Sequence, residues 1–322
     1  MELSGKKFLV IGGAGFIGSH VVAELLKYDV LEVLVFDNFS RGKEKYLTNS
    51  LNDPRCKIFP KGGDIREIEL LEEATNGVDG VFHLAAMWLL QCKDYPRAAF
   101  DVNIQGTFNV LEACVKNQVK KLVYSSSASV YGDALTEPMA EDHPFNNRNF
   151  YGASKIAGES MLRAFNDRYG LDYLSLRYMN VYGPNQDQLA AYTGVIPTML
   201  NMIDAKKQPI INGDGTQSYD FVEVRDVARA NLLAMISKES DMHLNVASGV
   251  KTSISDLCNL ILDIKGSELK VKYNPYSDDD SRRLVQNRVG STSQAKLKIG
   301  FESQIELIDG LQSLIAWRSS NE

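Results

Sequence analysis

The sequence predicts an α/β protein with a doubly wound parallel sheet and a smaller C-terminal α/β lobe. Apolar runs alternate with helical patterns in the first half of the chain, and glycines cluster where the first run meets the first helix. After about residue 177 the texture changes to loops, short strands and helices. We therefore expect one domain over residues 1–177 and a second over residues 178–322, with the last sheet elements interleaved between them.

The predicted sheet consists of short apolar runs that helical patterns separate. Such alternation requires crossover connections, which place helices on both faces of a parallel sheet. The predicted strands span 7–11, 33–36, 57–59, 81–84, 122–126 and 173–176, and the predicted helices include 16–28, 94–116, one that starts at Tyr151, and three near 225–236, 253–264 and 305–317.

The glycine cluster has the spacing of a dinucleotide-binding turn. Gly13, Gly15 and Gly18 satisfy G-x-G-x-x-G, and Gly12, Gly15 and Gly18 satisfy G-x-x-G-x-x-G. Glycine permits a tight turn and lets a pyrophosphate approach the backbone N–H groups at the start of a helix. The sequence therefore predicts a Rossmann-type domain.

Asp37 indicates which dinucleotide this domain binds. It ends the second predicted strand, about 20 residues past the glycines, where a carboxylate binds a ribose 2′-hydroxyl and repels a 2′-phosphate. The residue favours NAD over NADP, and the nearby Arg41 weakens that preference.

Tyr151 and Lys155 form the candidate catalytic pair. They are four residues apart on a predicted helix, so both project from one face. A free phenol, with a pKa of about 10, is a poor base at neutral pH, but a neighbouring ammonium and an oxidised nicotinamide favour the phenolate. Ser127, after the fifth strand, is expected to bind the substrate oxygen whose proton moves. The three residues predict redox chemistry at a hydroxyl or carbonyl group.

Composition argues against several other classes of protein. The net charge of −6 lacks the basic excess of a nucleic-acid binder. The most apolar stretch, 81–90, is about half the length that crosses a bilayer, so we expect no membrane span. The four cysteines have no C-x-x-C spacing and no accompanying secretory signal, and the four histidines are scattered. A cytoplasmic protein without a metal site is expected.

Many segments, in order, resemble the extended short-chain dehydrogenase/reductases of the nucleotide-sugar epimerase and dehydratase group. The matching segments are 12–18, 37–38, 63–65, 83–86, 102–103, 106–107, 124–132, 151–155, 177–184, 213–215 and 220–221. The segment 124–132 (YSSSASVYG) is most similar to UDP-glucose 4-epimerases. The resemblance covers nearly the whole chain and implies NAD as cofactor and a nucleotide-diphosphate sugar as substrate.

The resemblance also assigns cofactor-binding residues. It implies that Asp64 and Ile65 hold the adenine, that Ala85 and Ala86 lie beside the pyrophosphate and ribose, and that Lys155 binds the nicotinamide ribose. The remaining cofactor-binding residues taken from the matching segments are Phe16, Ile17, Asn38, Leu84 and Asn103.

The implied substrate site departs from the family pattern. Asn180 is expected near the diphosphate and Ser127 at the sugar 4-hydroxyl, but Tyr219 stands where the family has a diphosphate-binding arginine. A phenol does not replace the bidentate fork of arginine. The candidates to compensate are Arg282, Arg283 and Arg288. The segment 87–90 (MWLL) is also more apolar than usual, which predicts an unusual hexose pocket.

The resemblance favours a nucleotide-sugar 4-epimerase that transiently oxidises C4 of the hexose. Related dehydratases carry an Asp-Glu pair at the positions of Ala128 and Ser129, and related decarboxylases a nearby Glu. The alternatives are a 4,6-dehydratase with other acid–base residues, a 4-keto-reductase, and a non-catalytic NAD-sensing regulator.

A homodimer is the expected assembly. The predicted helices over 94–116 and from Tyr151 are apolar on more than one side, so each has a face left over after packing on the sheet. We expect these two helices to pair with their copies in a second subunit.

Overall fold

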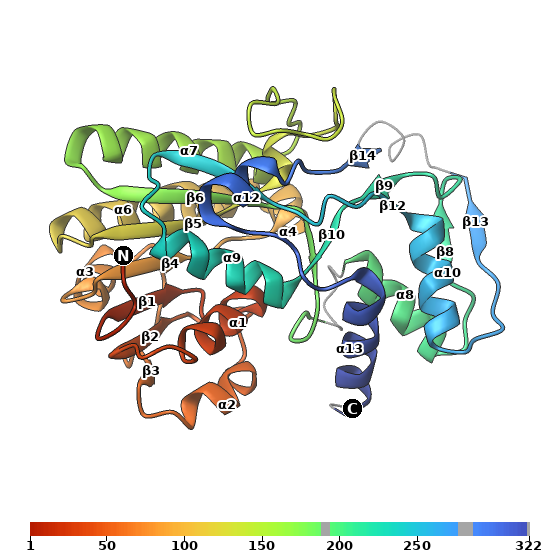
Figure 1. Ribbon diagram of the computed structural model, residues 1–322, viewed down its shortest axis with the longest axis horizontal. Coiled ribbons are helices and arrows are strands. Elements are labelled where there is room, and N and C mark those ends of the chain that lie inside the picture. Colours follow the sequence, from red (N-terminus) through yellow and green to blue (C-terminus); the bar gives the residue numbers. More distant parts are fainter. Residues whose placement is uncertain (188–193, 276–285, 321–322) are drawn as a thin grey trace.

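The computed structural model describes residues 1–187, 194–275 and 286–320. Its centre is a seven-stranded parallel sheet in the order β11-β6-β5-β4-β1-β2-β3 (Figure 1). The strands are β1 (Lys7–Ile11), β2 (Glu32–Phe36), β3 (Cys56–Ile58), β4 (Gly80–His83), β5 (Lys121–Ser127), β6 (Asp172–Tyr178) and β11 (Met242–Val246). The predicted Rossmann-type fold class is confirmed. The strand order reverses between β1 and β4, and ligands of such sheets bind at the carboxyl ends of the strands beside that point.

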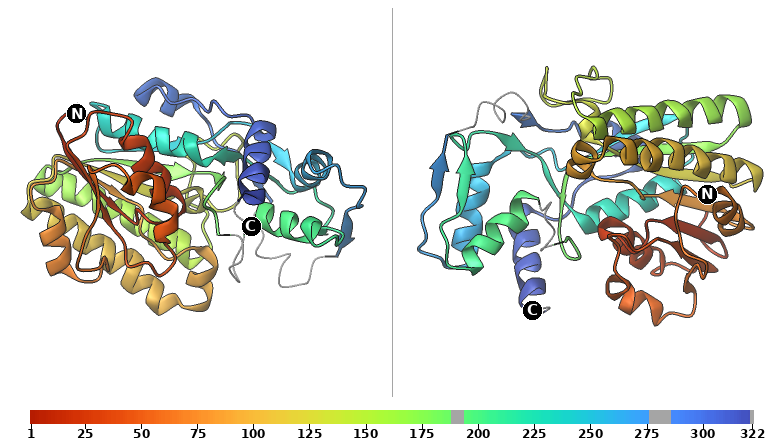
Figure 2. Two further views of the ribbon diagram at one scale, coloured as in Figure 1. Left: turned by 90° about the horizontal axis from the view of Figure 1, so that it is seen from below. Right: turned by 180° about the vertical axis from the view of Figure 1, so that it is seen from behind.

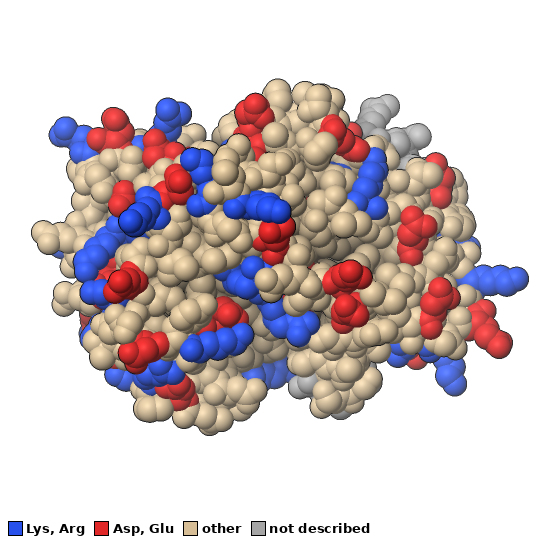
Figure 3. Space-filling view, viewed as in Figure 1, with Lys and Arg blue, Asp and Glu red and all other residues tan. Residues whose placement is uncertain are grey.

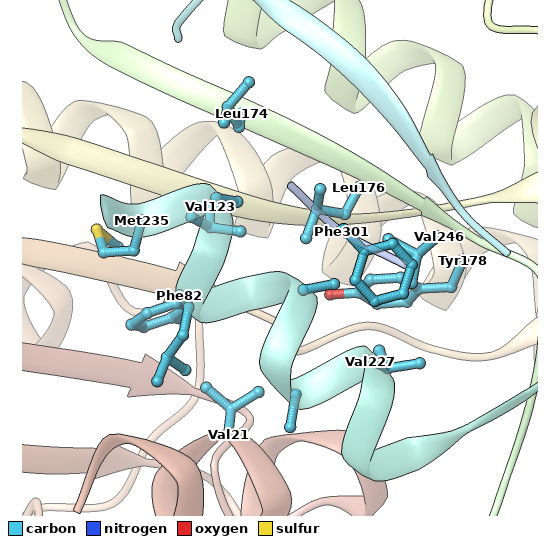
Figure 4. Close-up of a cluster of buried hydrophobic side chains, with 14 of the residues drawn as sticks. Val21, Phe82, Val123, Leu174, Leu176, Tyr178, Val227, Met235, Val246 and Phe301 are labelled. Atoms are coloured by element: carbon cyan, nitrogen blue, oxygen red, sulfur yellow. The ribbon is translucent and has the colours of Figure 1, made fainter. Parts of the chain in front are cut away.

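Helices cover both faces of the sheet (Figure 2). One face packs against α1 (Phe16–Leu25) and α9 (Val224–Ile236), and the other against α3 (Ile68–Thr75), α6 (Thr107–Lys116) and α7 (Phe150–Tyr169). Successive strand side chains alternate between the two cores, as the pleat requires: Phe8 and Val10 join the first, whereas Leu9 and Ile11 join the second. Figure 4 shows Val21 and Val227 from α1 and α9 in the first core.

The helix predicted over 94–116 begins at Pro96 and contains a π-helical turn. Residues 96–116 are helical throughout, as α5 (Pro96–Ala99), the π-helical turn η2 (Phe100–Gly106) and α6, and Tyr95 separates them from the preceding helix α4 (Leu89–Asp94). Pro96 has no backbone N–H to continue α4, and Tyr95 before it has non-helical dihedral angles of φ −128° and ψ 64°. The predicted helix is therefore confirmed over residues 96–116, and only its start was placed two residues too early.

Among the described residues, the smaller lobe consists of small sheets of two or three short strands and three helices. Its helices α8 (Val195–Asp204), α10 (Ile254–Ile264) and α13 (Leu307–Ser319) enclose a third core around Leu200, Leu257 and Leu314. Its strands are β7 (Asn180–Tyr182), β8 (Ile210–Asn212), β9 (Ser218–Tyr219), β10 (Phe221–Glu223), β12 (Thr252–Ser253), β13 (Lys272–Asn274) and β14 (Asn287–Arg288). The chain enters this lobe after β6 and returns to the sheet to form α9 and β11. It then runs back into the smaller lobe, where it forms β12 and α10.

The remaining short elements lie in the connections. They are η1 (Glu44–Leu47), α2 (Thr48–Leu51), the 3-10 turn η3 (Ala128–Val130) and α12 (Ser293–Ile299). On the face seen in Figure 3, Lys and Arg are interspersed with Asp and Glu. In the described part of the chain, no helix has both the length and the apolar character needed to span a membrane.

Candidate active site

The glycine turn between β1 and α1 is packed too closely for side chains. Gly12 has φ +81°, and a Cβ there would lie 2.7 Å from the backbone N of Ala85 at the end of β4. A Cβ at Gly18 would lie 2.1 Å from the carbonyl oxygen of Gly12. Gly15 caps the start of α1 in an extended conformation. These contacts explain why the motif needs glycine where the chain turns over the sheet.

A cavity of about 370 Å³ opens at this turn, beside the point where the strand order reverses. Nine of its lining residues were predicted from the sequence: Gly12, Gly15, Asp37, Asn38, Asp64, Ile65, Leu84, Ala85 and Ala86. Of the other predicted cofactor-binding residues, Phe16, Ile17, Gly18, Asn103, Tyr151 and Lys155 are not in its lining. The cavity is also lined by residues that no sequence motif indicated: Ser40, Gly42, Arg66, Gln91 and Ala98.

Asp37 presents a buried carboxylate to this cavity. Its Oδ2 accepts a hydrogen bond from the N–H of Ala14 at 2.9 Å, and its Oδ1 accepts one from the N–H of Phe39 at 2.8 Å. Burial raises the pKa of this carboxyl above its ordinary value, against the opposing effect of the two hydrogen bonds. A Cβ at Gly63 would lie 2.2 Å from the Asp37 backbone N, so a glycine is required there. The glycine turn and this carboxylate fit the pyrophosphate and ribose of a dinucleotide.

Asp64 lies at the rim of the cavity, and its side chain is ionised. Its carboxylate lies 2.6 Å from Nη2 of Arg66 and accepts a longer hydrogen bond of 3.4 Å from Asn38. The hydrogen bond from Arg66 holds the pKa of Asp64 at about 2. Asp64 and Arg66 thus form a fixed polar pair beside the space that the resemblance gives to the adenine.

Asn103 lies behind the cavity instead of in it. Its side chain is buried, accepts a hydrogen bond from the N–H of Met87 at 2.7 Å, and donates to the carbonyl of Met87 at 2.9 Å. It also donates to Oγ of Ser154 on α7 at 3.1 Å. The amide therefore joins the segment after β4 to the helix that carries Tyr151.

The apolar segment 87–90 meets the loop after β2 across the cavity. The guanidinium of Arg41 lies 5.3 Å from the ring centroid of Trp88, and Arg41 and Met87 both line the cavity. Such cation–π stacking contributes about 0.5–1 kcal/mol at exposed sites. Arg41 thus connects two loops that the sequence alone did not bring together.

Ser127, Tyr151 and Lys155 come together where β5 ends and α7 begins. Ser127 lies close enough to Tyr151 to lower the pKa of its phenol, and the Lys155 Nζ lies 5.7 Å from the centroid of the Tyr151 ring. Nζ also donates to the carbonyl of Ser125 at 2.6 Å. A Cβ at Gly158 would lie 2.3 Å from the Tyr124 hydroxyl, so glycine lets α7 approach β5 this closely.

Burial dominates the ionisation of this pair. It raises the pKa of Tyr151 to about 12, although the nearby Ser127 side chain and the charge of Arg288 act in the opposite direction. Burial likewise lowers the pKa of Lys155 to about 8. The protein's own groups therefore keep the phenol neutral, and a phenolate requires a further positive charge beside it.

The predicted substrate residues of the smaller lobe lie on short strands around Asp220. Asn180 pairs with Phe221 in register between β7 and β10, and Tyr219 pairs with Arg288 between β9 and β14. Asp220 is buried between them and accepts hydrogen bonds from Ser248, Gly249 and Gly290. Arg282 and Arg283 lie outside the described residues.

Other reactive groups do not form a second centre in the described ranges. Within residues 1–187, 194–275 and 286–320, no group of three His, Cys, Asp or Glu side chains is placed to hold a metal ion. All four cysteines are buried and unpaired.

Comparison with known proteins gives consistent matches along the chain. Residues 8–247 match the sequence model of the NAD dependent epimerase/dehydratase family. The UDP-glucose 4-epimerase of Mycolicibacterium smegmatis is 34% identical over 312 residues, which are 95% of this chain and 96% of that protein.

Two solved structures are similar over their whole length. One is the UDP-N-acetylglucosamine 4-epimerase from Methanobrevibacter ruminantium M1 in complex with UDP-N-acetylmuramic acid, with a TM-score of 0.92 and 34% identity over 99% of this chain and 100% of that one. The other is the UDP-glucose 4-epimerase from Thermotoga maritima with UDP-glucose, with a TM-score of 0.89 and 33% identity over 98% and 100%. Because the family model covers most of the sequence and relatives match it from end to end, the chain belongs to the NAD-dependent epimerase/dehydratase family of extended short-chain dehydrogenase/reductases.

Proposed function

We propose that the protein is an NAD-dependent nucleotide-sugar 4-epimerase that transiently oxidises C4 of a hexose. The observation that carries this proposal is the meeting of Ser127, Tyr151 and Lys155 at the junction of β5 and α7. A hydroxyl, a phenol and an ammonium gathered at one place can hold and move the proton of a sugar hydroxyl.

The residues around the cavity would hold the cofactor. The backbone N–H groups at the start of α1, beside Gly12 and Gly15, would bind the pyrophosphate, and Asp37 the ribose hydroxyls. Asp64 and Ile65 would contact the adenine, with Ala85 and Ala86 beside the pyrophosphate and ribose. When bound, NAD accepts a hydride from C4 of the sugar and later returns it.

Tyr151 would exchange the proton that accompanies the hydride. Its phenolate oxygen takes the proton of the 4-hydroxyl as the C4–H bond breaks, and gives it back to O4 when the keto sugar has presented its other face. Ser127 would hold O4 through its hydroxyl during both transfers. Lys155 would favour the phenolate by its charge and bind the nicotinamide ribose. The cofactor is unchanged after each cycle, so NAD should remain bound.

The residues after Ser127 favour epimerisation over elimination. Ala128 and Ser129 are buried in η3 and supply no carboxyl group to remove a C5 proton or protonate a leaving hydroxyl. The keto sugar therefore has no acid–base partner at these two positions for the loss of water.

The relatives indicate the substrate class. The T. maritima enzyme holds UDP-glucose, and the M. ruminantium enzyme holds UDP-N-acetylmuramic acid. We propose UDP-linked sugars as substrates here, with Asn180 and Tyr219 close to the diphosphate.

A homodimer accompanies this proposal. Phe100 and Phe108 are 48% and 41% exposed on the outer side of η2 and α6, and Phe108 packs on Phe165 of α7 with centroids 5.3 Å apart. Large aromatic side chains that are exposed together on one surface are typical of a surface that a partner subunit covers.

The buried thiols suit a reducing compartment, and we propose that the protein works in the cytoplasm.

The proposed function is tested with purified protein and a panel of UDP-sugars. The configuration at C4 is followed by proton NMR, the product mass by mass spectrometry, and the NADH content by absorbance. An epimerase interconverts two C4 epimers at constant mass without net NADH consumption. Loss of water would instead indicate a dehydratase, stoichiometric NADH consumption a reductase, and NAD binding without any turnover a regulator.

A further inference from the structure

Arg288 is a cation beside the reaction centre with little compensation. Its Nη2 donates one long hydrogen bond of 3.4 Å to the carbonyl of Gly132, and its Nε is buried without a hydrogen-bond partner in the described ranges. The neighbouring carboxylate of Asp133 accepts hydrogen bonds from the N–H groups of Gln286 and Asn287 at 2.9 and 3.2 Å. Among the described residues, no carboxylate lies within ion-pair distance of Arg288.

Such a group is costly unless an anion meets it. Removing a charge from water costs several kcal/mol when no partner replaces the solvent. Burial accordingly lowers the pKa of Arg288 below its ordinary value. The planar guanidinium matches the two oxygens of a carboxylate or phosphate, so an anionic group of the ligand is the natural partner.

The position of Arg288 indicates which part of the ligand it meets. It is paired in register with Tyr219 on the adjacent parallel strand, so the two side chains share a face of this small sheet. Its charge also acts on Tyr151 at the other end of the site. Arg288 thus lies within electrostatic reach of Tyr219, at the proposed diphosphate end, and of Tyr151, at the proposed C4 end, and its Nη2 bonds Gly132 of the segment 124–132 that carries Ser127. These three relations point to the sugar ring as the part of the ligand that Arg288 meets.

The strand that carries Arg288 is firmly held. The N–H of Asp220 donates to the carbonyl of Arg288 at 2.9 Å, and the Asp220 carboxylate accepts the N–H of Gly290 at 3.3 Å. Because Asp220 is buried and fixed by further hydrogen bonds, Arg288 is anchored on a rigid base, as a specificity residue requires.

We propose that Arg288 binds a carboxylate carried by the sugar, so that this enzyme prefers acidic nucleotide sugars to neutral ones. The proposal rests on the proposed function, since it takes Tyr151 as the C4 end of the site. It does not depend on which carbon bears the carboxylate, and a uronic acid and a lactyl ether present the same chemistry.

The test compares matched acidic and neutral ligands with the NAD-loaded protein. UDP-glucuronic acid is paired with UDP-glucose, and UDP-N-acetylmuramic acid with UDP-N-acetylglucosamine. Dissociation constants come from calorimetry and turnover from NMR. We expect the wild type to bind the acidic member of at least one pair about 10-fold or more tightly, as a charge-assisted hydrogen bond allows. The pair that shows this preference identifies the position of the carboxylate.

Two variants separate recognition of the carboxylate from other effects. Arg288→Gln should weaken binding of the acidic ligand about 100-fold and of its neutral partner less than about 5-fold. Arg288→Lys, which retains charge without the fork, should lose an intermediate amount. Lys270→Gln removes one positive charge from an exposed position of the smaller lobe and should change the binding of neither the acidic nor the neutral ligand.

Each contrary result has a distinct meaning. Equal weakening of acidic ligands, neutral ligands and UDP alone would assign Arg288 to the diphosphate and overturn the inference. A wild type without preference in either pair would overturn it even if the variants do not fold. If no UDP-sugar is turned over, the proposed function fails, while the binding ratios still decide the role of Arg288.

Discussion

Lys155 lowers the stability of the folded protein, although the proposed reaction requires it. Its ammonium is buried, lies 4.8 Å from the centroid of the Tyr124 ring and donates to the carbonyl of Ser125. Within the part of the chain that the structure describes, no carboxylate forms an ion pair with it. A buried ammonium with only these partners is destabilising when charged, which is why its pKa falls to about 8.

We predict that Lys155→Met stabilises the protein while abolishing turnover. Below pH 8 the wild type holds the lysine charged against its burial, and the shift from about 10.5 to about 8 corresponds to at most about 3 kcal/mol. The penalty is fully present below the folded pKa and disappears as pH rises from about 8 to 10.5, where the unfolded chain also loses the proton. Urea unfolding at pH 7 and at pH 10 measures the difference between variant and wild type. A variant less stable than the wild type at pH 7 would contradict this reading.

At single positions, the sequence predicts residues whose role follows from local chemistry. The glycine turn, Asp37 and the pair of Tyr151 and Lys155 belong to short contiguous motifs, and the structure brings each to the expected strand end. Asn103 and Arg288 are different because long-range packing decides what they face. Asn103 binds the backbone of Met87. Arg288 lies at the site because β14, a two-residue strand in the last part of the sequence, pairs with β9.

Among the elements, α7 is fastened to the sheet by a buried ion pair. The Arg177 Nη2 of β6 lies 2.7 Å from Oε2 of Glu159, and both side chains are buried. The hydroxyl of Ser126 on β5 donates to the same carboxylate at 2.6 Å. Glu159 is one turn beyond Lys155, and Ser126 precedes Ser127, so this network sets the register of the catalytic helix against the strand that carries Ser127.

We predict that Glu159→Gln lowers the free energy of unfolding by about 3 kcal/mol, because it leaves the Arg177 charge buried without a counter-charge. Burial raises the pKa of Glu159, but the hydrogen bonds and charge of Arg177 lower it overall. Its stabilising effect is therefore present above the ordinary carboxyl pKa and is lost as pH falls through the lowered value. Chemical unfolding at pH 7 and in acid should show the difference shrinking in acid.

The matched control is Glu73→Gln, which breaks the exposed pair with Lys61. Both of those side chains are about half exposed, at 47% and 57%, so the loss should stay below about 1 kcal/mol. If Glu159→Gln and Glu73→Gln lowered the free energy of unfolding equally, the buried pair of Glu159 and Arg177 would stabilise the protein no more than an exposed pair does.

The elements themselves were predictable where the pattern is local and strong. Six strands of the sheet were expected from short apolar runs, but β11 was not, because Met242–Val246 (MHLNV) is partly polar and is separated from its neighbour β6 by a long connection through the smaller lobe and α9. Its place beside β6 is set by packing in the first core. The break between α4 and the helical run over 96–116 was signalled by Pro96.

In the whole molecule, the outer side of α6 and α7 is the surface proposed for the homodimer. Phe100, Phe108 and Leu111 lie on one apolar track of the sequence, but the structure buries Leu111 completely in the core and leaves the two phenylalanines exposed. The π-helical turn Phe100–Gly106 lies between these positions and changes the helical period, so the apolar track does not stay on one side.

We predict that the protein sediments at about twice its 35.8 kDa mass and that Phe108→Glu shifts it to the monomer at micromolar concentration. A charge in the middle of an apolar interface has to be desolvated, which opposes association. Leu297→Glu, at a side chain of α12 that is 74% exposed, should leave the sedimentation unchanged. A wild type that sediments only as the monomer would rule out this assembly.

The proton-transfer role of Tyr151 is the claim on which the account depends, and turnover by Tyr151→Phe tests it most directly. We predict that the variant folds, retains NAD and loses about 10²–10⁴-fold in turnover, since only the phenol oxygen has been removed. Tyr169→Phe, an exposed tyrosine at the end of the same helix, should keep full activity. Turnover by NAD-loaded Tyr151→Phe within about tenfold of the wild type would contradict the account.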